Sequence, residues 1–302
     1  MVEYVGGGDS GTGITSIGSG KDYSTIAAWI ASLSDGTYSS GDDIIGELYD
    51  SSYDEAFNIG DAPFSIGGLN SVTLRANSAY KHDGTPDSGV KITYSGSVPD
   101  SSAPYTVSYD SSTYGEYKVK IEDIEFADFN NSADVHVYGF LLSEKTTIMS
   151  RCLVNNFSSN GSSTKRFRVF RQGKPRIQNC MIFNCGKTWG TGGVSANVQV
   201  FNLDNSTAAK VYNSTIYNIF DSSTNTVWGA FYGEYINTII VDAGTCFRLV
   251  SGSSNSNNIS SDSTAPGANS ITNKSAGTLF ISTIQGSEDL HLNTDSVCRE
   301  AG

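Results

Sequence analysis

Positive charge, histidine and proline are scarce in this chain of 302 residues, and long apolar runs are absent. The sequence has 19 basic residues against 31 acidic ones, which gives a net charge of −12. Such a chain lacks the basic face that general nucleic-acid binding requires. No run of 18 apolar residues occurs, so the sequence predicts no membrane span. The N-terminus has no basic start and no apolar core, so no signal peptide is predicted.

Metal-binding residue patterns are also missing. The 5 cysteines include no Cys-x-x-Cys pair, and none of the 3 histidines lies near a cysteine pair. These spacings do not suit a zinc site, so we expect no metal and no cofactor. A disulfide framework is not expected in a chain of this length. The cysteines are interpreted as thiols buried in the core.

The chain is rich in small polar residues and aromatic residues and poor in charged ones. Charged residues make up only 17% of the chain and aromatic residues 11%, with 32 glycines and 16 tyrosines. Aromatic residues favour strands, and glycine, serine and asparagine favour tight turns. A helical protein would need more alanine, leucine, glutamate and lysine. The composition therefore predicts an all-β protein.

The middle of the chain repeats a six-residue pattern that begins with a polar residue and closes with Asn or Asp. The copies are residues 123–128, 151–156, 179–184, 213–218, 237–242 and 257–262. The closing residues follow one another at intervals of 20 to 34 residues, which is typical of the coils of a solenoid. The alternative is a chance pattern in a chain rich in Asn and Ser.

Within each copy, the second and fourth residues share one face of a strand. Stacked coils would bury the fourth residues in one column, made of Phe126, Val154, Ile182, Ile216 and Ile240. Cys152 and Cys180 would be neighbours in a second column. The closing residues Asn156, Asn184 and Asn218 would stack as a ladder of turns, because asparagine tolerates left-handed backbone.

The N-terminal third contains the best helix candidate, residues 22–33. Asp22 can cap this helix, and Ile26, Trp29, Ile30 and Leu33 fall on one face. A solenoid must hide its open apolar end, so we expect this helix to be the cap. Strands are predicted at 43–49, 71–76 and 90–94. The predicted organisation is an N-terminal arm and cap helix over 1–34, a β-helix over 35–262, and a C-terminal loop and closing segment over 263–302.

The whole chain from about residue 15 resembles right-handed parallel β-helix proteins of the pectate-lyase-like class. The resemblance rests on Asp22-Tyr-Ser-Thr-Ile-Ala-Ala-Trp29, on the Asn-x-x-Ile-x-Asn repeat, and on Asp289-Leu-His-Leu292 with Glu300-Ala-Gly302. In that class the closing motif carries Pro where Val297 stands and Asp where Glu300 stands. The resemblance implies a right-handed parallel β-helix with an N-terminal capping helix. The N-terminal phrase also resembles virion proteins of tailed phages.

The densest group of carboxylates lies in residues 122–128, where Asp123 and Glu125 are expected on one face. Glycoside hydrolases need paired carboxylates, and lyases of this class need Ca²⁺ held by carboxylates with an Arg or Lys base. The neighbouring coils place Arg151, Leu153, Asn179 and Met181 in the same columns, so no pair is evident. The alternatives are a solvated acidic strand and a catalytic site built on Asp123 and Glu125.

Basic residues gather in residues 165–176. Strand alternation predicts that Phe167, Val169 and Arg171 share one face and that Arg166, Arg168, Phe170 and Gln172 share the other. Arg166 and Arg168 are candidate ligands for an acidic sugar or for the acidic strand of another subunit. The alternatives are a charged coil surface without a partner and lyase chemistry.

Aromatic residues concentrate around Trp189 and Trp228. Their rings are candidates for stacking on sugars along a groove of the solenoid. Packing in the core or at a subunit interface is the alternative for Trp228.

Two functions remain open at this point. The first is a non-enzymatic structural or glycan-binding protein of a virion or cell surface, such as a decoration protein, fibre or tailspike. It would assemble as a homotrimer, bind other virion subunits or a cell-surface polysaccharide, and lie in the virion or outside the cell. The alternative is a polysaccharide lyase or glycoside hydrolase that acts on an extracellular polymer.

Overall fold

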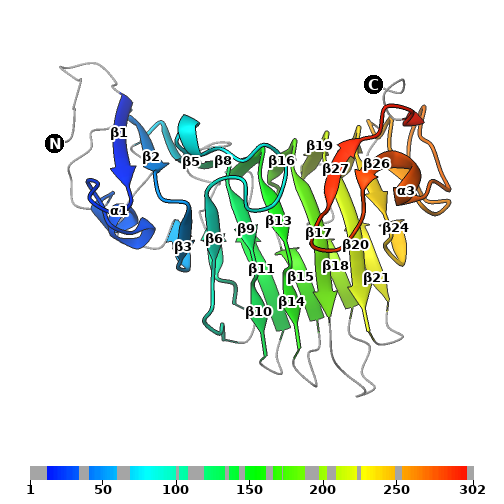
Figure 1. Cartoon of the computed structure of the whole chain (residues 1–302), viewed down its shortest axis with the longest axis horizontal. Helices are drawn as coiled ribbons and strands as arrows, with labels where there is room; N and C mark the ends of the chain where they lie inside the picture. Colours follow the sequence, from blue (N-terminus) through cyan, green and yellow to red (C-terminus); the bar gives the residue numbers. More distant parts are fainter. Residues whose placement is uncertain are drawn as a thin grey trace.

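The computed structural model in Figure 1 describes residues 12–33, 41–59, 69–99, 102–107, 119–132, 136–142, 147–160, 166–171, 173–187, 197–202, 209–222, 226–248 and 254–297. Most of its strands are short and parallel, and successive coils add strands to three long sheets. The result is a right-handed parallel β-helix, which confirms the predicted fold class. No helix within these ranges is long and apolar enough to span a membrane.

Sheet A consists in spatial order of β1 (Thr12–Ile17), β2 (Asp43–Leu48), β5 (Ser71–Ala76), β8 (Val119–Glu122), β12 (Thr147–Ser150), β16 (Arg176–Gln178), β19 (Lys210–Tyr212) and β22 (Glu234–Ile236). Sheet B consists of β3 (Ser52–Asp54), β6 (Lys91–Thr93), β9 (Glu125–Ala127), β13 (Leu153–Asn155), β17 (Met181–Lys187), β20 (Thr215–Asp221), β23 (Ile239–Val241) and β25 (Ile259–Ser260), with β10 (Asn130–Asn131) and β14 (Ser158–Ser159) at its side.

Sheet C consists of β4 (Phe57–Ile59), β7 (Tyr105–Val107), β11 (His136–Leu142), β15 (Arg166–Arg171), β18 (Asn197–Asn202), β21 (Val227–Phe231) and β24 (Thr245–Arg248). The remaining elements are the helices α1 (Ile26–Ser32) and α3 (Ala276–Leu279), the 3₁₀ turn Ser78–Tyr80, and the antiparallel hairpin of β26 (Phe280–Ser282) and β27 (Asp289–Leu292).

Each six-residue repeat begins at a sharp corner with a left-handed backbone, and the first five also close at one. The opening corners have φ between 47° and 61° at Asp123, Arg151, Asn179, Asn213, Asn237 and Asn257. The closing corners have φ between 50° and 57° at Asp128, Asn156, Asn184, Asn218 and Asp242. Asn and Asp enter this region more readily than other residues with a side chain. The corner geometry therefore explains why the repeats are bounded by these two residue types.

The closing corners form a partial ladder rather than the continuous one predicted. Asn156 Nδ2 donates to Asp128 Oδ1 at 3.1 Å, and Asn218 Nδ2 donates to Asn184 Oδ1 at 2.7 Å. The amide nitrogen of Asn184 instead donates to Glu288 Oε1 at 2.6 Å. The C-terminal segment thus diverts this amide from Asn156 in the preceding coil.

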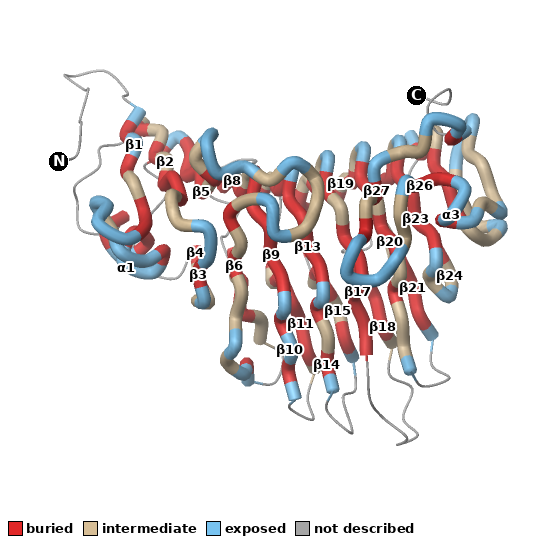
Figure 2. The backbone as a smooth tube through the Cα atoms, in the orientation of Figure 1, coloured by how far each residue is buried: buried red, intermediate tan, exposed pale blue. Residues whose placement is uncertain are grey.

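The predicted inner column is confirmed. Phe126, Val154, Ile182, Ile216 and Ile240 are each 0% exposed and stand in register on adjacent strands. Figure 2 shows buried residues running through the length of the coil. The four cysteines in the described ranges, Cys152, Cys180, Cys185 and Cys246, are free and buried, as expected. Cys298 lies outside the described residues.

The cap helix is present but shorter than predicted. Helix α1 spans Ile26–Ser32, and Thr25 caps it by accepting a hydrogen bond from the Ala28 amide at 3.0 Å. Asp22, the predicted cap, instead accepts hydrogen bonds from the amide and hydroxyl of Ser16. Trp29 is buried against β2, where a Cβ at Gly46 would lie 2.6 Å from the indole.

Both ends of the coil differ from the predicted limits. Strand β1, predicted within an N-terminal arm, pairs in parallel with β2 and belongs to the first coil. Parallel bridges join Ser256 to Ala268 and Ile259 to Ile271, so the predicted C-terminal loop contains one more short coil. The hairpin of β26 and β27 then folds back over the outer face of sheet B, where Phe280 and Leu290 join a second apolar cluster.

Ile182 offers a direct test of the inner column. Ile182→Ala should lower the free energy of unfolding by roughly 2–5 kcal/mol, because the truncation leaves a cavity between Val154 and Ile216. Ile182→Asp should cost more, because a buried carboxylate has no partner there. Urea denaturation measures both values. Wild-type stability in both variants would contradict the buried column.

Candidate binding site

The acidic strand is largely buried, so the interpretation as a solvated strand is wrong for both Asp123 and Glu125. Glu125 points outward from β9 but is only 1% exposed. Its two oxygens accept hydrogen bonds from Asn155 Nδ2 at 2.6 Å and from the Asp87 amide at 2.7 Å. Burial raises the pKa of Glu125 above its ordinary value, although these hydrogen bonds oppose the shift.

Asp123 lies at the opening corner and has different partners. Arg151 donates through Nε to Asp123 Oδ1 at 2.7 Å and through Nη2 to Oδ2 at 3.0 Å. Lys81 Nζ lies 3.0 Å from Oδ2. Burial acts to raise the pKa of Asp123, but the hydrogen bonds from Arg151 and Lys81 outweigh it and hold the pKa below its usual value.

Asp123 and Glu125 therefore do not act together in this structure. Each carboxylate faces its own set of donors, one at a corner and one beneath the loop that contains Asp87. Within the described ranges, no group of three or more His, Cys, Asp or Glu side chains could hold a metal ion. Both carboxylates serve as structural acceptors that fix the loop over residues 81–87.

Glu288 is a second buried carboxylate that sequence reasoning missed. It is bonded to Asn184 and to the Gly286 amide, and with Glu125 and Asp128 it lines a cavity of about 110 Å³. The contact joins residues 104 positions apart. No local signal predicts it, because it depends on the C-terminal segment folding back over sheet B.

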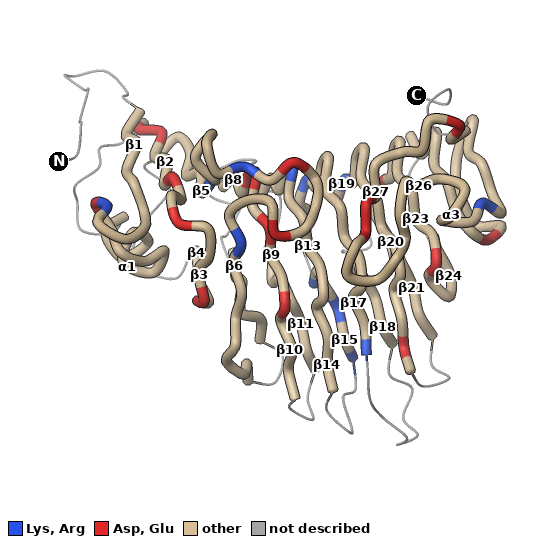
Figure 3. The backbone as a smooth tube through the Cα atoms, in the orientation of Figure 1, with Lys and Arg blue, Asp and Glu red and all other residues tan. Residues whose placement is uncertain are grey.

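The outer face of sheet C brings together the predicted basic and aromatic residues. Tyr138, Arg168, Gln199 and Trp228 stand in register on four successive strands, from β11 to β21. Arg166 lies exposed beside this column, in register with His136 and Asn197. Figure 3 shows basic residues gathered on β15. Three of the four predicted binding residues thus share one face.

The predicted alternation along β15 is wrong after Arg168. Val169 and Phe170 are both buried, and Arg171 therefore joins Arg166 and Arg168 on the outer side. Phe170 stacks inside the coil between Phe140 and Phe201, with ring centroids 4.8 and 5.2 Å apart. The apolar pairs Gly139-Phe140, Val169-Phe170 and Val200-Phe201 repeat this shift on three strands and are the signal that could have revealed it.

Aromatic rings hold guanidinium groups on this face. Arg171 lies 4.4 Å and Arg168 5.8 Å from the ring centroid of Tyr138. Arg248 lies 4.0 Å from the centroid of Trp228. Such cation–π contacts fix the cations without neutralising them. The aromatic residues thus position a row of positive charge.

Trp228 is not an open platform for a sugar ring. Its side chain lies on the outer face but is only 7% exposed, under Arg248 and stacked with Phe231 at 4.9 Å. It also lies outside the main apolar core. Its contribution to a site is to hold Arg248. Trp189, the other predicted aromatic residue, lies outside the described residues.

The arginines repel one another. Burial lowers the pKa of Arg168 to about 10, and the neighbouring charges of Arg166 and Arg171 add to this effect. Arg168 Nε donates to Gln199 Oε1 at 2.8 Å, and no ion pair with a described carboxylate is found for Arg166 or Arg168. An anion placed between these groups would relieve the repulsion.

Comparison with known proteins finds a structural similarity to pectin methylesterases. No family model matches the chain, and no curated protein matches it. Two crystal structures of pectin methylesterase from Aspergillus niger, one deglycosylated and one penultimately deglycosylated, are similar to the chain at 14% identity. Each comparison covers 91% of both chains, with TM-scores of 0.42 and 0.41. The chain is a right-handed parallel β-helix protein with a cationic outer face on sheet C.

Arg151 tests the role of the acidic corner. Arg151→Ala should lower the free energy of unfolding by about 1–3 kcal/mol, because the buried carboxylate of Asp123 loses its bidentate donor. Arg151→Asn should stay within about 1 kcal/mol of the wild type, because asparagine tolerates the left-handed corner. Its amide would face Asp123 as that of Asn156 faces Asp128. Urea denaturation distinguishes the two variants, and equal losses would contradict this assignment.

Proposed function

We propose that this protein is a non-catalytic β-helix that binds an acidic polysaccharide along the outer face of sheet C. The observation that carries the proposal is the row of arginines, Arg166, Arg168, Arg171 and Arg248, on one face of a protein with a net charge of −12. Guanidinium groups match the geometry of carboxylate and sulfate oxygens.

The spacing of the arginines suits a polymer. Arg171 on β15 and Arg248 on β24 are separated by three strand spacings along sheet C. At roughly 4.8 Å per strand this is about 14 Å along the axis. A single small anion cannot reach both positions, whereas an extended chain with regularly spaced acidic groups can.

The same face has little of what hydrolysis requires. The outward columns of the described part of sheet C contain arginines, amides and aromatic residues, but no Asp or Glu in register with Arg166, Arg168 or Trp228. A glycoside hydrolase of the usual kind needs two carboxyl groups on either side of the scissile bond. The absence of such a pair from these columns supports binding without turnover.

The proposal also includes the localisation and the oligomeric state of the protein. A virion or extracellular surface is where a rigid β-helix would meet a cell-surface polysaccharide, and a homotrimer would present several faces to it. These parts of the proposal rest on the resemblance of residues 22–29 to virion proteins of tailed phages.

Removing charge from β15 should weaken the interaction. The double variant Arg166→Ala and Arg168→Ala should bind polygalacturonate at least tenfold more weakly than the wild type, because two guanidinium contacts are lost. Binding by the wild type should also weaken as salt rises from low to physiological concentration, because Arg166 and Arg248 on this face are exposed to solvent. Isothermal titration calorimetry measures both effects.

Lys120→Ala is the matched control, because Lys120 is a basic residue on β8 of sheet A, away from sheet C. This variant should bind as the wild type does. Equal weakening in the Lys120 variant would mean that net charge, and not this face, governs binding. Absence of binding to any acidic polysaccharide, sulfated polymers included, would overturn the proposal.

A polysaccharide lyase is the second candidate, because Arg168 stands in the middle of the column proposed to bind a uronate chain, and burial lowers its pKa to about 10. As a neutral base, an arginine would take the proton from C5, beside the carboxylate of a uronate. The C4–O bond would break as a C4–C5 double bond forms, and water would protonate the departing glycosidic oxygen. Ultraviolet absorbance of that product distinguishes the two functions. Turnover by the wild type that is lost in Arg168→Lys would establish the lyase, whereas binding without absorbance change supports the proposal above.

A further inference from the structure

A second groove lies on the outer face of sheet B, beneath the C-terminal hairpin. It has a volume of about 410 Å³ and is bounded on one side by residues of β27 and on the other by the opening corners of three coils. This volume falls within the range of small-ligand sites. Neither the acidic strand nor the arginine face of sheet C contributes to it.

The floor of the groove is a single column of side chains. Met181, Thr215, Ile239 and Ile259 stand in register on β17, β20, β23 and β25. At roughly 4.8 Å per strand the column extends for about 14 Å along the axis. Three of these residues are apolar, and Thr215 adds one hydroxyl. The floor therefore offers a long apolar strip with one hydroxyl.

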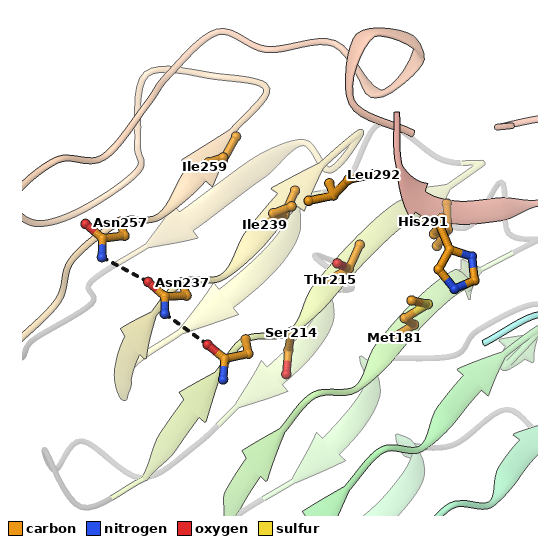
Figure 4. A pocket seen from close by; sticks show the side chains of 11 residues that line it. Met181, Ser214, Thr215, Asn237, Ile239, Asn257, Ile259, His291 and Leu292 are labelled. Carbon is orange, nitrogen blue, oxygen red and sulfur yellow. Dashed lines mark hydrogen bonds between the residues drawn. The ribbon is translucent and has the colours of Figure 1, made fainter. Parts of the chain in front are cut away.

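One wall of the groove is a ladder of amides, shown in Figure 4. Asn257 Nδ2 donates to Asn237 Oδ1, and Asn237 Nδ2 donates to Asn213 Oδ1, each at 3.0 Å. Each amide has two N–H donors and two acceptor lone pairs, so the ladder uses only part of its capacity. Asn257 Oδ1 is buried without any hydrogen-bond partner. Asn213 and Asn237 are exposed, so the wall presents their remaining donors and acceptors at the spacing of the coils.

The opposite wall comes from β27. Leu290 is buried in the second apolar cluster, and Leu292 packs against that cluster. His291 closes the end of the groove, with its Nδ1 2.6 Å from Asp289 Oδ1. A Cβ at Gly84 would lie 3.0 Å from the imidazole, so this side chain is wedged against the loop after β5. Among the residues that the structure describes, no Lys, Arg, Asp or Glu lines the groove.

From this geometry we infer that the groove binds a neutral oligosaccharide chain aligned with the solenoid axis. The apolar column faces the C–H surface of the sugar rings, and the amide ladder exchanges hydrogen bonds with ring hydroxyls. A charged sugar would be desolvated here without an opposite charge to pair with. Amides repeating every 4.8 Å or so can contact consecutive sugar residues of an extended chain. This site is separate from the proposed acidic-polysaccharide site on sheet C.

The test is calorimetric titration of the full chain with hexasaccharides of glucose, mannose and N-acetylglucosamine, with hexagalacturonate as the charged comparison. At least one neutral hexasaccharide should bind. Thr215→Tyr should weaken that binding at least tenfold, because the larger side chain fills the middle of the floor. Asn237→Gly should weaken it severalfold, because glycine keeps the left-handed corner, where φ is 52°, but removes the central amide.

Asn218→Gly is the matched control. Asn218 has a φ of 50° and donates one ladder hydrogen bond, as Asn237 does, but it lies at a closing corner outside the groove. Its variant should bind the neutral sugar like the wild type, as should the double variant at Arg166 and Arg168. Failure of every neutral hexasaccharide to bind at millimolar concentration would overturn the inference. Unchanged affinity in Thr215→Tyr, or binding of hexagalacturonate at this groove, would also overturn it.

Discussion

The structure depends on a backbone constraint, the left-handed corners that open the sheet B strand in six successive coils and close it in five of them. A left-handed corner turns the chain within a single residue, so the chain passes from sheet A to sheet B through the same backbone conformation in these six coils. Asn and Asp tolerate this conformation and bond to their counterparts in the next coil. Because the corners hold the register, inward positions remain inward over many coils. This register aligns side chains into columns, both in the core and on the outer surface of the solenoid.

Arg151 is the exception that shows what the corners require. It occupies a left-handed position, with φ of 52°, where the column otherwise has Asn or Asp. For an ordinary residue such as arginine, the left-handed conformation costs roughly 1–2 kcal/mol. Its guanidinium group offsets this cost by pairing with Asp123 and Glu122. The corner therefore links the acidic strand to the coil and occupies both oxygens of Asp123 with hydrogen bonds from Arg151.

Much of the fold could be predicted, because the repeat marks the left-handed corners that six successive coils share. The inner column from Phe126 to Ile240 follows from strand alternation. In each short strand the second and fourth residues of the repeat identify the side that faces the core. Alternation failed on β15, because the shift at Val169 adds one residue to the inner side. The burial of Glu125 and the contact of Glu288 with Asn184 could not be predicted, because they depend on segments distant in sequence.

The two proposed sites differ because the outer faces of the coil are covered differently. The C-terminal hairpin covers part of sheet B and leaves an uncharged groove, whereas the outer face of sheet C carries arginines held by Tyr138 and Trp228. The left-handed corners lie at the ends of the sheet B strands and do not place the arginines of sheet C. The bulge shared by β11, β15 and β18 turns Arg171 outward beside Arg166 and Arg168.

The central claim is that an acidic polysaccharide lies along sheet C. Hydrogen–deuterium exchange measured by mass spectrometry, with and without polygalacturonate, tests it most directly. The account predicts slower exchange in peptides that contain β15, β18, β21 and β24, and unchanged exchange in peptides of β2, β5 and β8 on sheet A. Protection confined to sheet A or sheet B, with none on β15, would contradict it.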